Sequence, residues 1–328
     1  MKLLLTGGAG FVGHHLVEGV LKQTDWDIII MDGLTYAGDY NRIGDIECFQ
    51  QERSRFRAVY HDLRSPLTPE VHRQIGPVDV VWHLAANSHV DRSLVDALPF
   101  AESTVVGTTN LLQYVRQYQP DLKRYIGFNT DEVFGPADYG QFHKEGERFR
   151  PSNPYSAAKA GQWAMEYAFA HSFRLPISMV HSMNIFGERQ NPEKFIPMTV
   201  RNILDGKPVI LHGSPEHPSS RCWIHAREVC NALIFLTDHA RDEQSYNVIG
   251  QEKTVYAITA KLGEIIGLPV HLEWLDYHST RPGHDLRYAL DGSKLKGMGF
   301  MYTYSVDAAL ETTTHWMIQG ENRRWLYT

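Results

Sequence analysis

The chain has 328 residues, of which 43% are hydrophobic, and this content is sufficient to form a large buried core. Its formal net charge of −6 gives no general basic surface, and its 17 histidines show no HExxH spacing, so neither a nucleic-acid partner nor a metal site is expected. No apolar run approaches the roughly 20 residues of a membrane span, and three cysteines without CxxC spacing suit a reducing compartment, which predicts a cytoplasmic protein with no membrane partner.

The N-terminal segment predicts a strand, a glycine-rich turn and a helix. A short apolar run at 2–5 is followed by the glycine-rich stretch 6–13 and by a helical pattern over 15–21. The next apolar run, at 28–31, is rich in isoleucine, which is typical of a strand covered on both faces. Asp32 stands at its end.

Further apolar runs alternate with segments of helical length. Strands are expected at 56–60, 78–82, 125–128 and 177–181, with helices at 100–118 and 155–173. Strands that alternate with helices predict an α/β fold with a doubly wound parallel sheet. In such a sheet, ligands bind at the carboxyl ends of the strands.

The pattern changes after position 181. Stretches at 187–197 and 212–221 are rich in proline, glycine and charge, and they predict a smaller C-terminal substrate-binding domain that is interleaved with the end of the sheet. The expected ranges are 1–181 plus about 226–250 for the first domain, and 182–225 plus 251–328 for the second.

The glycine-rich stretch has the spacing of a dinucleotide-binding turn. Gly7, Gly10 and Gly13 form G-x-x-G-x-x-G, in which the absent side chains permit a tight turn and the close approach of a diphosphate. The helix N-terminus that follows favours an anion. Asp32 can accept hydrogen bonds from both ribose hydroxyls and would repel a 2′-phosphate, so the pattern predicts a Rossmann-type domain that binds NAD and not NADP.

A tyrosine and a lysine lie one helical turn apart in the segment after position 154. Tyr155 and Lys159 occupy positions i and i+4, so their side chains share one face of the predicted helix. A nearby ammonium, together with a positively charged nicotinamide ring, is expected to lower the pKa of the phenol, which would then act as a base. Thr130 precedes this pair at a strand end.

Two acids follow Thr130 directly. Neighbouring side chains on a strand normally point in opposite directions, so one reading of Asp131 and Glu132 places one of them in solvent. The chain bends at a strand end, however, and both acids can then reach one ligand. Burial and mutual repulsion would separate their pKa values, so that one serves as an acid and the other as a base.

These motifs resemble a known enzyme family. The glycine turn, Thr130, Tyr155 and Lys159 together resemble the extended short-chain dehydrogenase/reductases. Within that group, Thr-Asp-Glu-Val-Phe-Gly at 130–135 is similar to the Thr-Asp-Glu-Val-Tyr-Gly motif of the dTDP-glucose 4,6-dehydratases, and the resemblance runs almost end to end. It implies an NAD-dependent hydro-lyase that acts on a nucleotide-diphosphate hexose, with the second domain binding the nucleotide sugar.

The chain departs from that family pattern at four positions. Asn87 replaces Glu, Thr104 replaces Asn, Asn129 replaces Ser, and Phe134 replaces Tyr. None of these changes removes an expected catalytic group. The sequence leaves open the nucleotide base and the substituent at C2 of the sugar.

The resemblance also implies the roles of particular residues. Catalytic roles are expected for Thr130, Asp131, Glu132, Tyr155 and Lys159. Cofactor contacts are expected for Gly7, Gly10, Phe11, Val12, Gly13, Asp32, Leu34, Thr35, Gly38, Asp62, Leu63, Leu84, Ala85, Ala86, Tyr155 and Lys159. Substrate contacts are expected for Ser88, His89, Thr130, Asn184, Glu193, Lys194, Phe195, Arg221, Asn247 and Arg287. The two arginines are expected to clamp phosphate, because the planar guanidinium group meets two oxygens at once.

The implied reaction oxidises C4, removes water across C5–C6 and returns the hydride to C6. Tyr155 would take the proton of the C4 hydroxyl, Glu132 the C5 proton, and Asp131 would protonate the leaving C6 hydroxyl. Two alternatives stay open: a UDP-sugar 4-epimerase or decarboxylase of the same fold, and a non-catalytic NAD-binding protein. The resemblance also implies a homodimer formed through the long helices beside the sheet.

Overall fold

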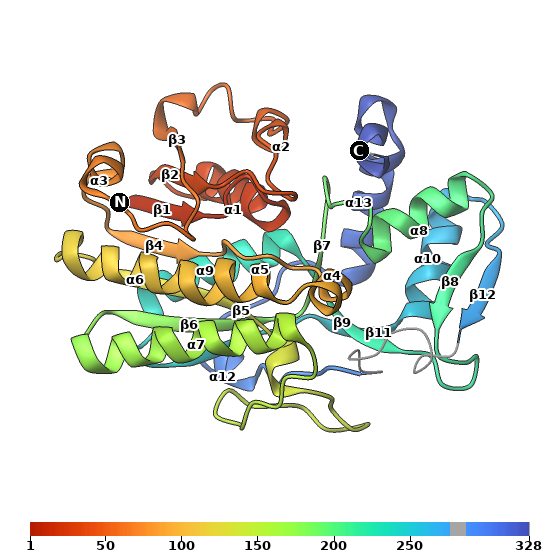
Figure 1. Cartoon of the computed structure of the whole chain (residues 1–328). Coiled ribbons are helices and arrows are strands. Elements are labelled where there is room, and N and C mark those ends of the chain that lie inside the picture. The colour runs from red at the N-terminus through yellow and green to blue at the C-terminus, as the bar shows by residue number, and fades with distance from the viewer. Residues whose placement is uncertain (276–286, 328) are drawn as a thin grey trace.

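The computed structural model describes residues 1–275 and 287–327. The strands of its main sheet are β1 (Lys2–Thr6), β2 (Asp27–Asp32), β3 (Phe56–Tyr60), β4 (Val80–His83), β5 (Arg124–Thr130), β6 (Ile177–Ser182) and β10 (Ser245–Val248). Within the described residues these seven strands are all parallel, in the order β10-β6-β5-β4-β1-β2-β3 (Figure 1). The expected Rossmann-type sheet is confirmed.

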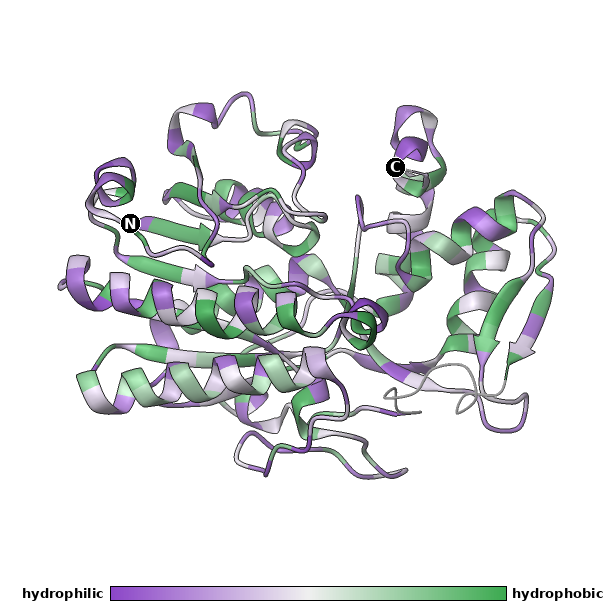
Figure 2. Ribbon diagram, viewed as in Figure 1, coloured by the Kyte–Doolittle hydropathy of each residue, from purple (hydrophilic) through white to green (hydrophobic). Residues whose placement is uncertain are grey.

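Helices cover both faces of this sheet, and therefore its central strands are apolar at successive positions. Leu3, Leu4 and Leu5 on β1 are fully buried although they alternate between the two faces. Figure 2 shows this hydrophobic character in the strands of the sheet. The flanking elements are α1 (Phe11–Gln23), α2 (Asn41–Gly44), η1 (Arg53–Arg55), α3 (Pro69–Ile75), α4 (Val90–Val95), α5 (Leu98–Ala101), η2 (Glu102–Val106), α6 (Gly107–Tyr118), α7 (Pro154–Phe173) and α9 (Ala226–His239). Helices α6 and α7 pack together over one face, and α1 packs with α9 over the other (Figure 1).

The helix expected at 155–173 begins one residue earlier for a clear chemical reason. Asn153 caps α7: its side chain accepts a hydrogen bond from the backbone N–H of Ser156 at 2.8 Å, and Ser156 Oγ in turn accepts one from the backbone N–H of Asn153. Pro154 occupies the first helical position, where its missing N–H costs nothing. This capping fixes the start of the helix that carries Tyr155 and Lys159.

The helix expected at 100–118 is interrupted by a different helical turn. The π-helical turn η2 lies between α5 and α6, so the three elements run on as one helix with a local irregularity. Turns of this type occur frequently at functional sites. Here the turn carries Ser103, whose side chain borders the cavity described below.

A smaller lobe with its own hydrophobic core lies beside the sheet (Figure 1). Its elements are β7 (Asn184–Phe186), α8 (Phe195–Leu204), β8 (Val209–His212), β9 (Ser220–His225), β11 (Gln251–Thr254), α10 (Val255–Ile266), β12 (Leu272–Leu275), α13 (Val306–Ile318) and η4 (Gly320–Leu326). Helix α12 (Ser293–Gly297) packs against β10 of the main sheet instead. Strands β11, β9 and β7 form one small sheet, and β12 pairs with β8. No helix in the described ranges combines the length and apolar character that a membrane crossing requires.

Candidate active site

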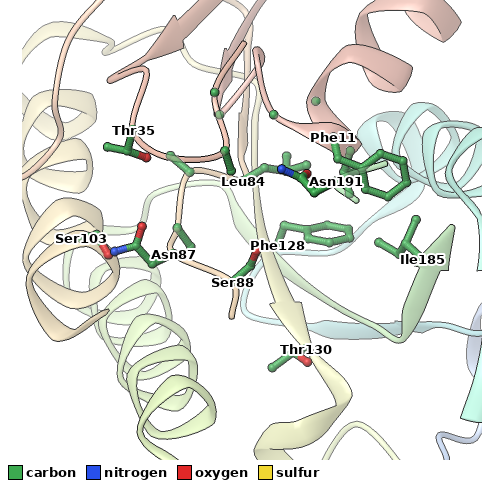
Figure 3. Close-up of a pocket in the computed structure, with 18 of the residues that line it drawn as sticks. Phe11, Thr35, Leu84, Asn87, Ser88, Ser103, Phe128, Thr130, Ile185 and Asn191 are labelled. Carbon is green, nitrogen blue, oxygen red and sulfur yellow. The ribbon is translucent and has the colours of Figure 1, made fainter. Parts of the chain in front are cut away.

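A cavity of about 550 Å³ lies at the carboxyl ends of the main-sheet strands, where the two lobes meet. The glycine turn and the loops after β2, β3 and β4 line one part of it. The end of β5, the start of α7 and the segment 182–196 line the rest. Figure 3 shows side chains from these segments around one space, with Phe11 and Asn191 near the start of α1 and Thr130 at the end of β5.

The glycine turn leaves no room for side chains. Gly7 has a φ of +73°, and a Cβ atom there would lie 2.9 Å from the backbone nitrogen of Ala85. A Cβ atom at Gly13 would lie 2.2 Å from the carbonyl oxygen of Gly7. Because α1 starts directly after Gly10, its free N–H groups face the cavity, and the turn therefore fits a diphosphate.

Asp32 borders the cavity at the end of β2. Its Oδ2 accepts a hydrogen bond from the backbone N–H of Ala9 at 2.9 Å, and its Oδ1 accepts one from Leu34 at 2.8 Å. Burial raises the pKa of Asp32, and the two N–H groups act against that rise. Each carboxylate oxygen keeps a further lone pair, so the group is able to accept from a ribose hydroxyl.

The chain bends at the end of β5, as the sequence predicted. Thr130 ends the strand, and the 3₁₀ turn η3 (Asp131–Phe134) begins directly after it. Both Asp131 and Glu132 therefore border the cavity. The Thr130 hydroxyl donates to Asp131 Oδ1 at 3.1 Å, and Asn153 donates to Glu132 Oε2 at 3.1 Å.

The two neighbouring acids differ in their environment. Asp131 is 5% exposed, and its Oδ2 has no hydrogen-bond partner among the described residues. Burial, assisted by the nearby charge of Glu132, raises the pKa of Asp131 to about 7. Asp131 is therefore the acid that holds a proton near neutral pH.

Tyr155 and Lys159 both border the cavity. Burial and the charge of Glu132 raise the pKa of Tyr155, while the hydrogen bond with Thr130 acts against that rise. The Lys159 ammonium donates to the carbonyl oxygen of Phe128 at 2.8 Å and to Gln162 at 2.9 Å. The expected lowering of the pKa of Tyr155 involves the nicotinamide ring as well as Lys159, so it stays a prediction for the complex with the cofactor.

Most of the expected cofactor and substrate residues also line the cavity. Lys194 and Ser88 are both on its wall, and Lys194 Nζ donates to the carbonyl oxygen of Ser88 at 3.0 Å. The remaining expected residues on its wall are Phe11, Val12, Thr35, Gly38, Asp62, Leu63, Leu84, Ala85, Ala86, Asn184 and Phe195.

Six expected residues are not on the cavity wall: Leu34, His89, Glu193, Arg221, Asn247 and Arg287. Arg287 donates to both carboxylate oxygens of Glu252 and to the carbonyl oxygens of Asp138 and Gln141, so its guanidinium group is engaged within the protein. The side-chain amide of Asn247 likewise donates to the carbonyl oxygens of two neighbouring loops.

Arg221 is not on the cavity wall, but its charge acts on a residue that is. Its guanidinium group lies over the ring of Tyr288 at 5.1 Å, yet its charge still acts to lower the pKa of Asp131. Arg287 belongs to a segment at 281–288 that resembles an arginine-bearing segment of the dTDP-glucose 4,6-dehydratases, and residues 281–286 of it lie outside the described residues.

The cavity includes residues that sequence reasoning did not assign to the site. Asn191 lies in the stretch 187–197, whose richness in proline, glycine and charge was the signal that pointed to this part of the chain. Asn129 was noted only as a departure, yet it lines the cavity and its Nδ2 has no hydrogen-bond partner among the described residues. The other unassigned wall residues are Met31, Gly33, Tyr36, Ala37, His61, Arg64, Asn87, Ser103, Phe128, Ser182, Met183, Ile185, Gln190, Ile196 and Trp223.

Comparison with known proteins identifies the family. A family model described as GDP-mannose 4,6 dehydratase matches residues 4–313. The chain belongs to this family. It is similar to the dTDP-glucose 4,6-dehydratase of Salmonella typhimurium, with 31% identity over 99% of this chain and 94% of that relative.

Solved structures of related proteins share the same fold. DesIV, a dTDP-glucose 4,6-dehydratase from Streptomyces venezuelae crystallised with NAD bound, has a TM-score of 0.89 and 33% identity, and the match covers 100% of this chain and 99% of DesIV. The UDP-glucose 4-epimerase of Thermus thermophilus, in complex with NAD, has a TM-score of 0.85 and 24% identity, with 96% of this chain and 98% of the epimerase covered. At that identity, the likeness to the epimerase shows the fold alone.

Proposed function

We propose that this protein is an NAD-dependent nucleotide-sugar 4,6-dehydratase, and that its substrate is dTDP-glucose. One observation carries the proposal: Asp131 and Glu132 border the same cavity as Thr130 and Tyr155, and Asp131 has a pKa of about 7. An epimerase or a simple dehydrogenase has no use for two such acids, whereas removal of water needs an acid and a base. The similarity to the dTDP-glucose 4,6-dehydratases supports the same conclusion.

NAD is the cofactor that the cavity fits best. The glycine turn would hold the diphosphate, and Asp32 would accept hydrogen bonds from the adenosine ribose. The same carboxylate would repel a 2′-phosphate, which disfavours NADP. When bound, NAD supplies a hydride acceptor for C4 and a hydride donor for C6.

The side chains of the protein would perform the proton transfers. Thr130 would orient the C4 hydroxyl, and Tyr155 would accept its proton when C4 becomes a ketone. The ketone acidifies the C5 hydrogen, which Glu132 would remove, while Asp131 would donate a proton to the C6 hydroxyl as it leaves as water. Glu132 would return a proton to C5 as C6 receives the hydride, so the products are one water and the 4-keto-6-deoxy sugar nucleotide, with no net oxidation or reduction.

The raised pKa of Tyr155 sets a requirement on the complex. With a raised pKa the phenol keeps its proton near neutral pH, so a positive charge must act on it before it serves as a base. The Lys159 ammonium and the nicotinamide ring would supply that charge when the cofactor is bound. We therefore expect the pKa of Tyr155 to fall when NAD binds.

We further propose that the protein is a cytoplasmic homodimer with α6 and α7 at the interface. Large hydrophobic side chains are exposed on and near these helices, and burial of such side chains between two copies would be favourable. They are Leu94, Val95, Leu98, Val106, Tyr167 and Phe173. The functional division is proposed to follow the ranges given above, with NAD in the first domain and the nucleotide sugar in the second.

Product analysis tests the proposal. The protein, supplied with NAD, is incubated separately with dTDP-glucose, UDP-glucose and UDP-N-acetylglucosamine, and each product is analysed by mass spectrometry. We expect loss of one water, fastest from dTDP-glucose. A C4 epimer, which keeps its mass and is identified by nuclear magnetic resonance, would support the rival epimerase, and release of carbon dioxide from UDP-glucuronate in a parallel incubation would support the rival decarboxylase. No turnover on any sugar would support a non-catalytic NAD-binding protein.

A further inference from the structure

A chain of buried polar groups leads away from the cavity along the inner face of α7. Lys159, Gln162 and Glu166 lie on one face of this helix and are all buried. Lys159 Nζ donates to Gln162 Oε1 at 2.9 Å, and Gln162 Nε2 donates to Glu166 Oε1 at 2.9 Å. Gln162 therefore connects the lysine at the cavity to a carboxyl group deeper in the protein.

The adjacent strand is shaped to accept that carboxyl group. On β5, a Cβ atom at Gly127 would lie only 2.1 Å from Glu166 Oε1, so the absence of a side chain makes the space that Glu166 occupies. From the same strand, the Tyr125 hydroxyl donates to Glu166 Oε1 at 3.3 Å. Glu166 Oε2 has no hydrogen-bond partner among the described residues.

The titratable groups around Lys159, Gln162 and Glu166 indicate that Glu166 balances the charge of Lys159. On β4, burial and the charge of Lys159 lower the pKa of His83 to about 3, so His83 is neutral near pH 7. Burial, assisted by Glu166, raises the pKa of Tyr125, and burial raises that of Tyr155, so neither phenol supplies a negative charge near neutrality. Glu166 is the group whose attraction raises the pKa of Lys159 against the effect of burial.

Burial acts on both members of the pair in the direction that removes charge. It lowers the pKa of Lys159 and raises the pKa of Glu166, and their mutual attraction opposes both shifts. A buried ammonium with no counter-charge loses its proton readily. The charge state of Lys159 near neutral pH therefore depends on Glu166.

We propose that Glu166 is a positioning residue, whose buried carboxylate keeps Lys159 protonated and, through Gln162, holds its ammonium group in place at the cavity wall. The significance for turnover rests on the proposed function, because Lys159 matters to the reaction only if Tyr155 is its base. The effect on Lys159 itself does not depend on that function.

Glu166→Gln tests the charge alone, because glutamine keeps the size of the side chain and its ability to accept from Gln162 and Tyr125. The matched control is Glu264→Gln, which removes an exposed glutamate paired with Lys261 at 2.9 Å on α10. Titration of Lys159 is followed in the NAD-loaded protein by the nuclear magnetic resonance of ¹³C- and ¹⁵N-labelled lysine. Lys159→Met identifies the signal by its loss.

We expect Glu166→Gln to lower the pKa of Lys159 by about one to two units, and Glu264→Gln to leave it unchanged. Loss of the Lys159 proton should add a second fall of kcat for dTDP-glucose above the one set by Asp131, and Glu166→Gln should move this second fall to lower pH by a similar amount, with little change in KM. Glu166→Asp, which keeps the negative charge, should bring the pH of that fall most of the way back to its wild-type value. An unchanged Lys159 titration in folded Glu166→Gln would overturn the proposal.

A second variant keeps the proposal testable if Glu166→Gln does not fold, as judged by circular dichroism. Gln162→Met removes the link and leaves Glu166 in place. We expect it to lower kcat about tenfold with little change in KM, and unchanged kcat would overturn the proposal. Absence of turnover in the wild-type protein would contradict the proposed function instead, while the lysine titration would still decide the role of Glu166.

Discussion

Replacement of Asp131 by asparagine separates the two proton transfers of the proposed elimination. The carboxyl group lies in the cavity wall with a pKa of about 7, so about half of the molecules hold its proton at pH 7. An asparagine amide has a similar shape and still accepts from the Thr130 hydroxyl, but it cannot donate a proton to the leaving hydroxyl. Asp131→Asn should therefore remove acid catalysis with little disturbance of the site.

The expected loss follows from the usual contribution of a positioned acid. Such a group contributes about 10² to 10⁴ in rate, or about 3 to 5 kcal/mol in the barrier, and we expect Asp131→Asn to lower kcat for water loss by that factor. KM should change little, because the group acts in the transition state. Glu132 is unchanged in this variant and should still remove the C5 proton.

An assay in deuterium oxide distinguishes the two acids. Recovered dTDP-glucose should contain deuterium at C5 after incubation with Asp131→Asn, because C5 exchange continues while elimination stalls. Glu132→Gln should show neither exchange nor product. Asp121→Asn, at an exposed acid before β5, is the control and should behave as wild type. Near-normal water loss by Asp131→Asn would refute the assignment of Asp131 as the acid.

Three further predictions follow from the same contacts. The wild-type kcat should fall about tenfold per pH unit well above pH 7, as Asp131 loses its proton, and a rate that stays flat to pH 9 would contradict the role of its acid form. Asp131→Asn should also stabilise the fold. Because the pKa of Asp131 is raised in the folded state, the wild type loses stability as pH rises from about 4 to about 7. The difference in unfolding free energy between the variant and the wild type, measured by urea titration at several pH values, should grow over that range to about 2 to 4 kcal/mol and then stay constant. Asp32→Ala should weaken NAD binding about 10- to 100-fold in calorimetry and reduce the preference over NADP, whereas unchanged affinity would place the adenosine ribose elsewhere.

The sequence predicted the fold well because the pattern is set by local physics. Strands buried on both faces read as continuous apolar runs, and glycines at a dinucleotide turn have spacing that few other structures require. The bend was also predictable in outline, because polar residues follow the apolar run at 125–128, although β5 continues through Asn129 and Thr130 before the chain turns. These features place the five expected catalytic residues in one cavity.

Features that depend on distant parts of the chain were not predictable. Arg287 was expected to face phosphate, but its ion pair with Glu252 depends on how β11 and the loop after Gly135 meet. The role of Glu166 was missed because its partners are a glycine and a tyrosine on another element. The raised pKa of Tyr155 in the protein without cofactor was not predictable, because the sequence does not reveal how deeply the phenol is buried.

The central claim is that one sugar ring is oxidised at C4 and reduced at C6 within a single active site. A single turnover with dTDP-glucose that carries deuterium at C4 tests it most directly, with the position of the label determined by nuclear magnetic resonance of the product. We predict that the deuterium appears at C6 of a 4-keto-6-deoxy product. Recovery of the label at C4 of an epimerised sugar, or its loss to solvent, would contradict the account.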